Sequence, residues 1–163
     1  MIRALALCAA TALLGSCGQA PQLLTVDKYL AQCEALKGKP VQLAGYLGEC
    51  AGYDCHMTAS KQAWDRYLDA FKRSAGSPKA TPEGRKAQRA AWEEMQSVPM
   101  IGIGGDEAFD RQAAPFQNRS VVITAQVAKD SCTGAGGTDR SAGIEPSDIR
   151  AWTSSEGAPA NTN

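Results

Sequence analysis

Cysteine placement restricts the fold of this chain more strongly than any other part of its sequence. The 163 residues include six cysteines and one histidine, His56, which directly follows Cys55. Which cysteines reach the folded protein depends on the N-terminus, where Met1-Ile2-Arg3 precedes an apolar run over residues 4–14. That run is shorter than the roughly 20 residues that span a bilayer and is typical of a signal peptide. Cys8 lies inside it and is expected to be removed.

The apolar run ends in Leu14-Gly15-Ser16-Cys17, which resembles the lipobox of bacterial lipoproteins. The resemblance implies that residues 1–16 are cleaved off and that Cys17 carries the lipid. The mature chain would then be held by its acyl chains on the inner leaflet of the outer membrane, facing the periplasm, because Gly18 rather than Asp follows the lipidated cysteine. An ordinary secretory signal with a chance cysteine is the alternative.

Four cysteines remain after these two: Cys33, Cys50, Cys55 and Cys132. An even number of cysteines in an exported domain predicts two disulfides. We expect one between Cys50 and Cys55, closing a short turn, and one between Cys33 and Cys132, joining distant parts of the chain. Crossed pairings that involve Cys132 also fit the count.

The segment Cys50-Ala-Gly-Tyr-Asp-Cys55-His56 also permits a c-type haem. Haem attachment uses two thiols and an adjacent histidine, usually as Cys-x-x-Cys-His, and the longer spacing found here is a rarer variant. A zinc site is a further alternative, because Cys50, Cys55 and His56 with Cys33 or Cys132 would supply four ligands. The sixth haem ligand would be one of three methionines: Met57, Met95 or Met100. Oxidising surroundings favour disulfides, so we expect no cofactor and treat haem or metal as the alternative.

The charge balance of the mature chain argues against nucleic acid as a partner. Without Arg3 the 17 basic residues become 16 against 17 acidic ones, a net charge of −1. No basic surface is indicated. We expect a lipidated tether over 17–24, one domain over 25–152 and a polar, disordered tail over 153–163.

Hydrophobic periodicity predicts a mixed β/α domain. Thr25 is expected to cap a first helix that ends at Gly38. Strands are expected near residues 40–47, 53–59, 99–105, 121–128 and 144–152. A helical hairpin is expected over 60–97 and a short helix over 107–114.

An opening strand Lys-Pro-Val-x-Leu-x-Gly at 39–45 and a later strand Arg-Ser-Val-Val-Ile-Thr at 119–124, with a short helix before it, resemble an oligonucleotide/oligosaccharide-binding (OB) barrel. The resemblance implies a small barrel of about five strands. Residues 60–97 would be a helical insertion between its second and third strands. A generic α+β domain is the alternative.

Four aromatic residues of the predicted hairpin fall on a helical stripe: Trp64, Tyr67, Phe71 and Trp92. Such a stripe predicts packing against the rest of the domain. A ligand groove is the alternative.

No catalytic constellation is evident around His56, which we expect to be partly exposed. The glycine-rich segment Ile-Gly-Ile-Gly-Gly before Asp106 and Glu107 suggests a nucleotide loop, but its third glycine is missing and the two acids would repel a phosphate. Tight-turn glycines with Asp106 as a helix cap are therefore expected. Asp139 and Arg140 are expected to form at most a local ion pair.

The sequence therefore predicts a lipid-anchored, non-catalytic binding or interaction module. Its partner would be an envelope protein or peptidoglycan, which rests on analogy with OB folds. The alternatives are a small haem or metal lipoprotein that uses Cys50, Cys55 and His56, and a hydrolase with His56, Asp106 and Glu107 as candidates. The oligomeric state is not determined by the sequence.

Overall fold

The computed structural model describes residues 21–52, 54–129, 132, 140 and 143–153. The expected signal peptide, the lipid-attachment residue Cys17 and nearly all of the expected tail lie outside these residues. No helix among the described residues has the length and apolar character needed to cross a membrane.

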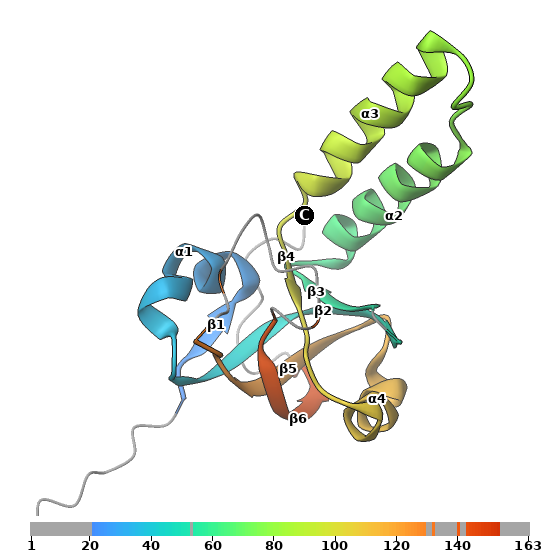
Figure 1. The fold of residues 1–163 in the computed structure, drawn as a ribbon. Helices are drawn as coiled ribbons and strands as arrows, with labels where there is room; N and C mark the ends of the chain where they lie inside the picture. Colours follow the sequence, from blue (N-terminus) through green and yellow to red (C-terminus); the bar gives the residue numbers. More distant parts are fainter. Residues whose placement is uncertain (1–20, 53, 130–131, 133–139, 141–142, 154–163) are drawn as a thin grey trace, which may run out of the picture.

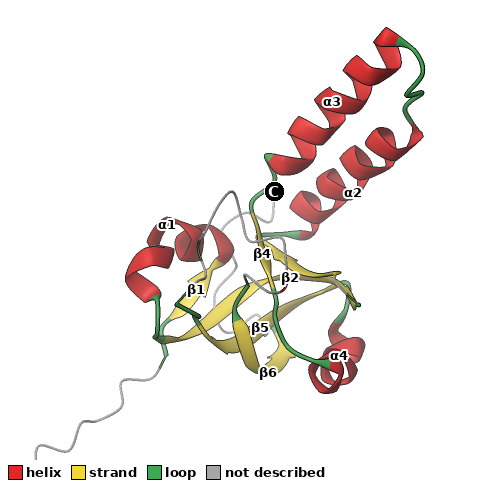
Figure 2. Cartoon of the chain, in the orientation of Figure 1, coloured by secondary structure: helices red, strands yellow, loops and turns green. Residues whose placement is uncertain are grey.

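The described residues form a mixed α/β structure, as the periodicity predicts, with a six-stranded sheet and four α-helices (Figures 1 and 2). A short 3₁₀ helix, Ala114–Phe116, follows the last α-helix. The strands are β1 (Leu23–Thr25), β2 (Pro40–Ala51), β3 (Asp54–Thr58), β4 (Met100–Gly102), β5 (Arg119–Gln126) and β6 (Glu145–Ala151). The helices are α1 (Val26–Leu36), α2 (Lys61–Gly76), α3 (Pro82–Gln96) and α4 (Glu107–Ala113).

Strand β2 lies at the centre of the sheet, whose order is β4-β3-β2-β5-β6, and β1 pairs with β2 in parallel. The other pairings between these strands are antiparallel. β1 corrects the expected tether over 17–24, because Leu23 and Leu24 already belong to the sheet and Leu24 is buried. The tether was predicted because three strand residues are too few to produce a periodic pattern.

The main core lies on one face of the sheet. Leu43, Leu47 and Ile123 point into it, and α1 and α4 add residues such as Val26 and Phe109 from different sides (Figure 1). Capping defines these helices locally: the Thr25 hydroxyl accepts a hydrogen bond from the amide of Lys28, and the Asp106 carboxylate accepts two from the first turn of α4. Both caps were predicted.

The two edge strands approach each other where the glycine-rich segment meets the start of β6. Ile103 and Ile144 form one parallel bridge, the Gly104 amide donates to the Ile144 carbonyl at 2.8 Å, and the Ile144 amide donates to the Gly102 carbonyl at 3.1 Å. A side chain on Gly143 would collide with the Gly102 carbonyl. One isolated bridge is not enough to show a closed barrel. The described strands therefore form an open sheet.

Helices α2 and α3 form an antiparallel hairpin that projects from the sheet between β3 and β4 (Figure 1). Ser60 and Thr81 cap the two helices through their side-chain oxygens. Arg73 on α2 and Glu94 on α3 form an ion pair across the hairpin. The insertion predicted over 60–97 is therefore present, and its base rests on the sheet.

Candidate functional site

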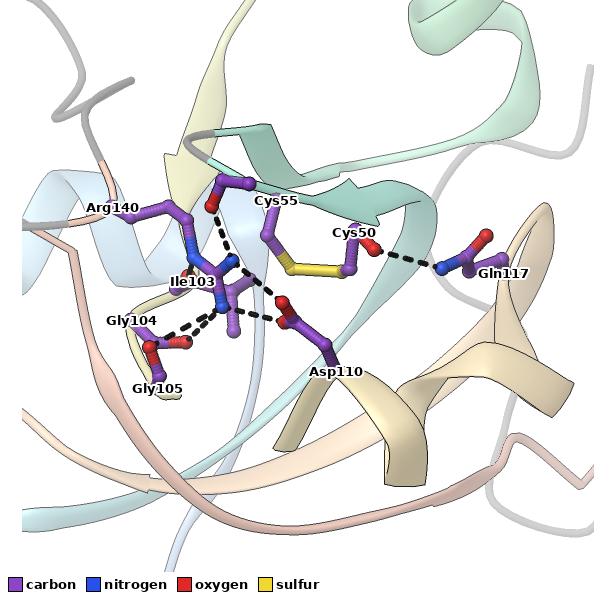
Figure 3. The surroundings of a disulfide bond; sticks show 9 residues. Cys50, Cys55, Ile103, Gly104, Gly105, Asp110, Gln117 and Arg140 are labelled. Atoms are coloured by element: carbon purple, nitrogen blue, oxygen red, sulfur yellow. Dashed lines mark hydrogen bonds and ion pairs between the residues drawn. A yellow bond between two sulfur atoms is a disulfide. The ribbon is translucent and has the colours of Figure 1, made fainter. Parts of the chain in front are cut away.

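The sulfur atoms of Cys50 and Cys55 lie at disulfide distance, with Cα atoms 4.0 Å apart, on partner positions of β2 and β3 (Figure 3). Both side chains belong to the main core. Successive strand residues point to opposite faces, and His56 accordingly lines the outer surface beside the hairpin instead. The structure therefore does not bring His56 together with the two cysteines, although the three residues lie within a short segment of the sequence.

Cys33 of α1 and Cys132 likewise lie at disulfide distance, with Cα atoms 5.7 Å apart and a separation of 99 positions along the chain. The four cysteines thus meet in the two pairs that we expected, a geometry that fits disulfide bonds. Within the described part of the chain, no three His, Cys, Asp or Glu side chains cluster in a way that could hold a metal ion.

The outer face of β2 and β3 forms the floor beneath the hairpin. Trp64 of α2 lies directly over Gly48, where any side chain would collide with its indole ring. The Trp64 and Tyr67 rings are stacked with centroids 5.4 Å apart, and the Tyr67 and His56 rings lie 6.4 Å apart at a tilted angle. His56 is 4% exposed, so the expectation of a partly exposed residue was wrong: the hairpin covers it.

A groove of about 490 Å³ opens between this floor and the hairpin. Phe71 and Trp92, from the two helices, line it and are 52% and 50% exposed. The aromatic stripe therefore divides: Trp64 packs against the sheet as predicted, whereas Phe71 and Trp92 present their rings to solvent. The groove also contains Tyr67 and four further polar residues: Asp54, His56, Gln96 and Ser97.

The electrostatic character of the groove is set by Asp54, at the start of β3. Asp54 is the one carboxylate among the lining residues, and these include no lysine or arginine. Burial raises the pKa of the Tyr67 hydroxyl above its ordinary value, and the negative charge of Asp54 raises it further. The groove thus combines one carboxylate with three aromatic rings.

The hydroxyl of Ser97 does not serve as an activated nucleophile in this geometry, although it shares the groove with His56 and Asp54. It donates to the carbonyl of Glu94 at 2.7 Å, within the last turn of α3. Asp106 and Glu107 do not line the groove. Asp106 caps α4, which holds its pKa below the usual range because backbone amides donate to the carboxylate. The hydrolase candidates are therefore not assembled around His56.

Arg140 is a structural clamp rather than part of the groove (Figure 3). Its guanidinium lies 2.7 Å from Asp110 of α4 and also donates to the carbonyls of Ile103, Gly52, Gly104 and Gly105. The backbone carbonyls of the glycine-rich segment thus face the guanidinium. Asp139, the partner considered for Arg140 from the sequence, lies outside the described residues.

Comparison of the chain with protein-family models, curated proteins and solved structures found no match. The function must therefore be inferred from the groove itself.

Sequence reasoning missed the polar part of this groove. Asp54 was not considered as a site residue, because the two cysteines that flank it were taken as the candidate site. Those cysteines face the core, whereas Asp54 faces the groove. The available signal was its alternation: Asp54 and His56 lie two positions apart on a strand and therefore share a face.

Proposed function

We propose that this chain is a lipid-anchored, periplasm-facing binding module of the OB type, with the groove beneath the α2–α3 hairpin as its ligand site. The proposal rests mainly on the observation that Phe71 and Trp92 expose half of their surface in a concave, mostly apolar site with few polar groups. Ligand sites have this composition, and volumes of about 300–1,000 Å³ are typical of them.

The sheet order supports an OB-type fold. Strands β2 to β6 would be the five barrel strands in chain order, with α4 between the third and fourth of them. The parallel bridge between Ile103 and Ile144 joins the third strand to the fifth, which favours closure at this point. OB folds bind ligands on the face of their second and third strands, and here β3 and β4 contribute Asp54, His56 and Met100 to the groove.

Site-specific photocrosslinking in cells tests the binding role. A photoreactive residue in place of Trp92 is expected to capture an envelope protein or a peptidoglycan fragment. The same residue in place of Glu83, an exposed position of α3 outside the groove, serves as the matched control.

Adducts from position 92 should disappear when Phe71→Ala removes the opposite side of the groove. Equal capture from positions 92 and 83, or capture that persists in Phe71→Ala, would contradict the groove as the ligand site. Absence of any adduct from position 92 would also contradict it.

A further inference from the structure

The charge of the groove points to one class of ligand. Its twelve lining residues include one aspartate and no lysine or arginine. Three aromatic rings and several apolar side chains make up most of the remaining surface. A cleft that carries one sign of charge favours ligands of the opposite sign.

No lysine or arginine side chain lines the groove beside Asp54, and its one imidazole is that of His56. None of the four basic residues of α2 lines the groove, and two of them form ion pairs elsewhere: Lys61 with Asp65, and Arg73 with Glu94. None of the ion pairs between described residues includes Asp54. Burial is the larger cause of the raised pKa of the Tyr67 hydroxyl, and the negative charge of Asp54 adds to it.

Aromatic rings and a carboxylate together form the usual environment of a bound organic cation. An ammonium or guanidinium group is attracted to the face of a Trp, Tyr or Phe ring. The aliphatic stem of Lys or Arg packs at the same time on apolar surface. Leu30, Met95 and Met100 supply such surface in this groove.

We propose that the groove binds a peptide segment of a partner protein through the side chain of a lysine or arginine, with Asp54 as counter-ion and the rings of Phe71 and Trp92 as cation-binding surfaces. This inference rests on the proposed function and names its ligand class. A volume of about 490 Å³ exceeds that of one basic side chain, so neighbouring residues of the peptide also fit.

The experiment compares two pentapeptides that differ by one charge. One is acetyl-Ala-Ala-Lys-Ala-Ala-amide, and the other has norleucine in place of lysine, which keeps the aliphatic stem. A trimer of N-acetylglucosamine is the third probe. The protein is the full chain in detergent micelles with ¹⁵N-labelled tryptophan, so each of its three indole groups gives a signal.

The lysine peptide is expected to shift the Trp92 indole signal and leave that of Trp152 unchanged. It should bind about five-fold more tightly than the norleucine peptide, as expected for a cation against aromatic rings and a carboxylate. This preference should weaken in Asp54→Asn, where only the aromatic rings still favour the cation, and persist in full in Glu83→Gln. It should also weaken as salt is raised.

Equal binding of the two peptides would overturn the cation site, as would a preference that is undiminished in Asp54→Asn. Binding of the N-acetylglucosamine trimer alone would overturn the peptide class but leave the groove as the ligand site. Failure of the binding role itself would appear separately, as loss of specific photocrosslinking from position 92.

Discussion

The guanidinium of Arg140 and the carboxylate of Asp110 lie 2.7 Å apart, and their side chains are only 10% and 22% exposed. This pair joins α4 to a residue 30 positions further along the chain. The same guanidinium donates to the carbonyl of Gly52 in the β2–β3 turn and to that of Gly104 in the glycine-rich segment. Arg140 therefore holds α4, the β2–β3 turn and the glycine-rich segment together.

Replacement of Arg140 by alanine is expected to lower the free energy of unfolding by about 2–4 kcal/mol, because Asp110 would be left partly buried without its partner. Arg140→Lys should recover little, since one ammonium group cannot reproduce the planar fork of donors. Urea denaturation measures both. The control is Arg111→Ala, whose exposed pair with Glu107 should contribute about 0.5 kcal/mol or less. Equal effects at Arg140 and Arg111 would contradict the clamp.

Gly143→Ala is expected to destabilise the protein by about 1–3 kcal/mol, because the new methyl group would collide with the Gly102 carbonyl and force the two sheet edges apart. Gly76→Ala at the end of α2 is the matched control, since a methyl group there meets no atom within 4 Å. That change should be neutral or stabilising by up to about 1 kcal/mol. Thermal unfolding of the two variants decides the matter, and a neutral Gly143→Ala would show that the edges are not in contact.

Loss of the two cysteine pairs is expected to have unequal effects. Replacing Cys33 and Cys132 together by serine should cost about 4–5 kcal/mol, because this link closes 99 residues of chain. Replacing Cys50 and Cys55 together should cost about 2 kcal/mol. Urea denaturation of each double variant under non-reducing conditions measures this difference, and the reverse order would contradict the loop-closure account.

Non-reducing peptide mapping should recover both pairs and leave no free thiol among these four cysteines. The same sample distinguishes the haem alternative. A Soret band at about 410 nm, together with peptides that carry haem on Cys50 and Cys55 and therefore have neither a free thiol nor a disulfide there, would replace the disulfide with a thioether-linked haem.

Alkaline pH should destabilise the fold through Tyr29 of α1. Burial raises the pKa of its hydroxyl to about 12, whereas the phenol of an unfolded chain ionises near about 10. The stability contributed by the neutral phenol is thus fully present below about pH 10 and is lost as pH rises towards 12. After allowance for residual solvent screening the loss is about 1–2 kcal/mol. Urea titrations at pH 8 and pH 11.5 should show a smaller drop in Tyr29→Phe than in the unaltered chain. An equal drop in both would assign the effect to other groups.

The membrane anchor predicted from the sequence can be tested at Cys17. Cys17→Ser removes the thiol that carries the lipid in bacterial lipoproteins and should abolish incorporation of radiolabelled palmitate. Cys8→Ser lies in the segment expected to be cleaved off and should leave labelling unchanged. Absence of labelling in the unaltered chain would favour the ordinary secretory signal instead, and labelling that persists in Cys17→Ser would contradict Cys17 as the lipid-attachment residue.

Local signals explain why most helices and strands could be predicted. The caps at Thr25 and Asp106 and the hydrophobic periodicity of the strands are short-range patterns, and they were confirmed within a few residues at most boundaries. Strand β1 was missed because it is stabilised by pairing with a distant segment rather than by its own pattern.

The candidate site was harder to predict than the fold. The aromatic stripe was recognised, but whether each ring packs inward or faces solvent depends on the angle at which the hairpin leaves the sheet. Trp64 lies at the base of the hairpin over Gly48. Phe71 lies further along α2, where the sheet no longer covers it fully. A helical repeat specifies a face of a helix, not the distance from that face to the nearest strand.

The sequence alone determined the predicted targeting segment, the cysteine count and the order of secondary structure, because all of these depend on residues close together in the chain. Only the tertiary structure decided that Cys55 and His56 serve opposite faces of one strand, that Arg140 pairs with Asp110, and that Asp54 shares a groove with Trp92. These relationships join residues that are neighbours on opposite sides of a strand or distant along the chain. They arise only when the strands pair and the hairpin packs, since that packing sets which side chains meet.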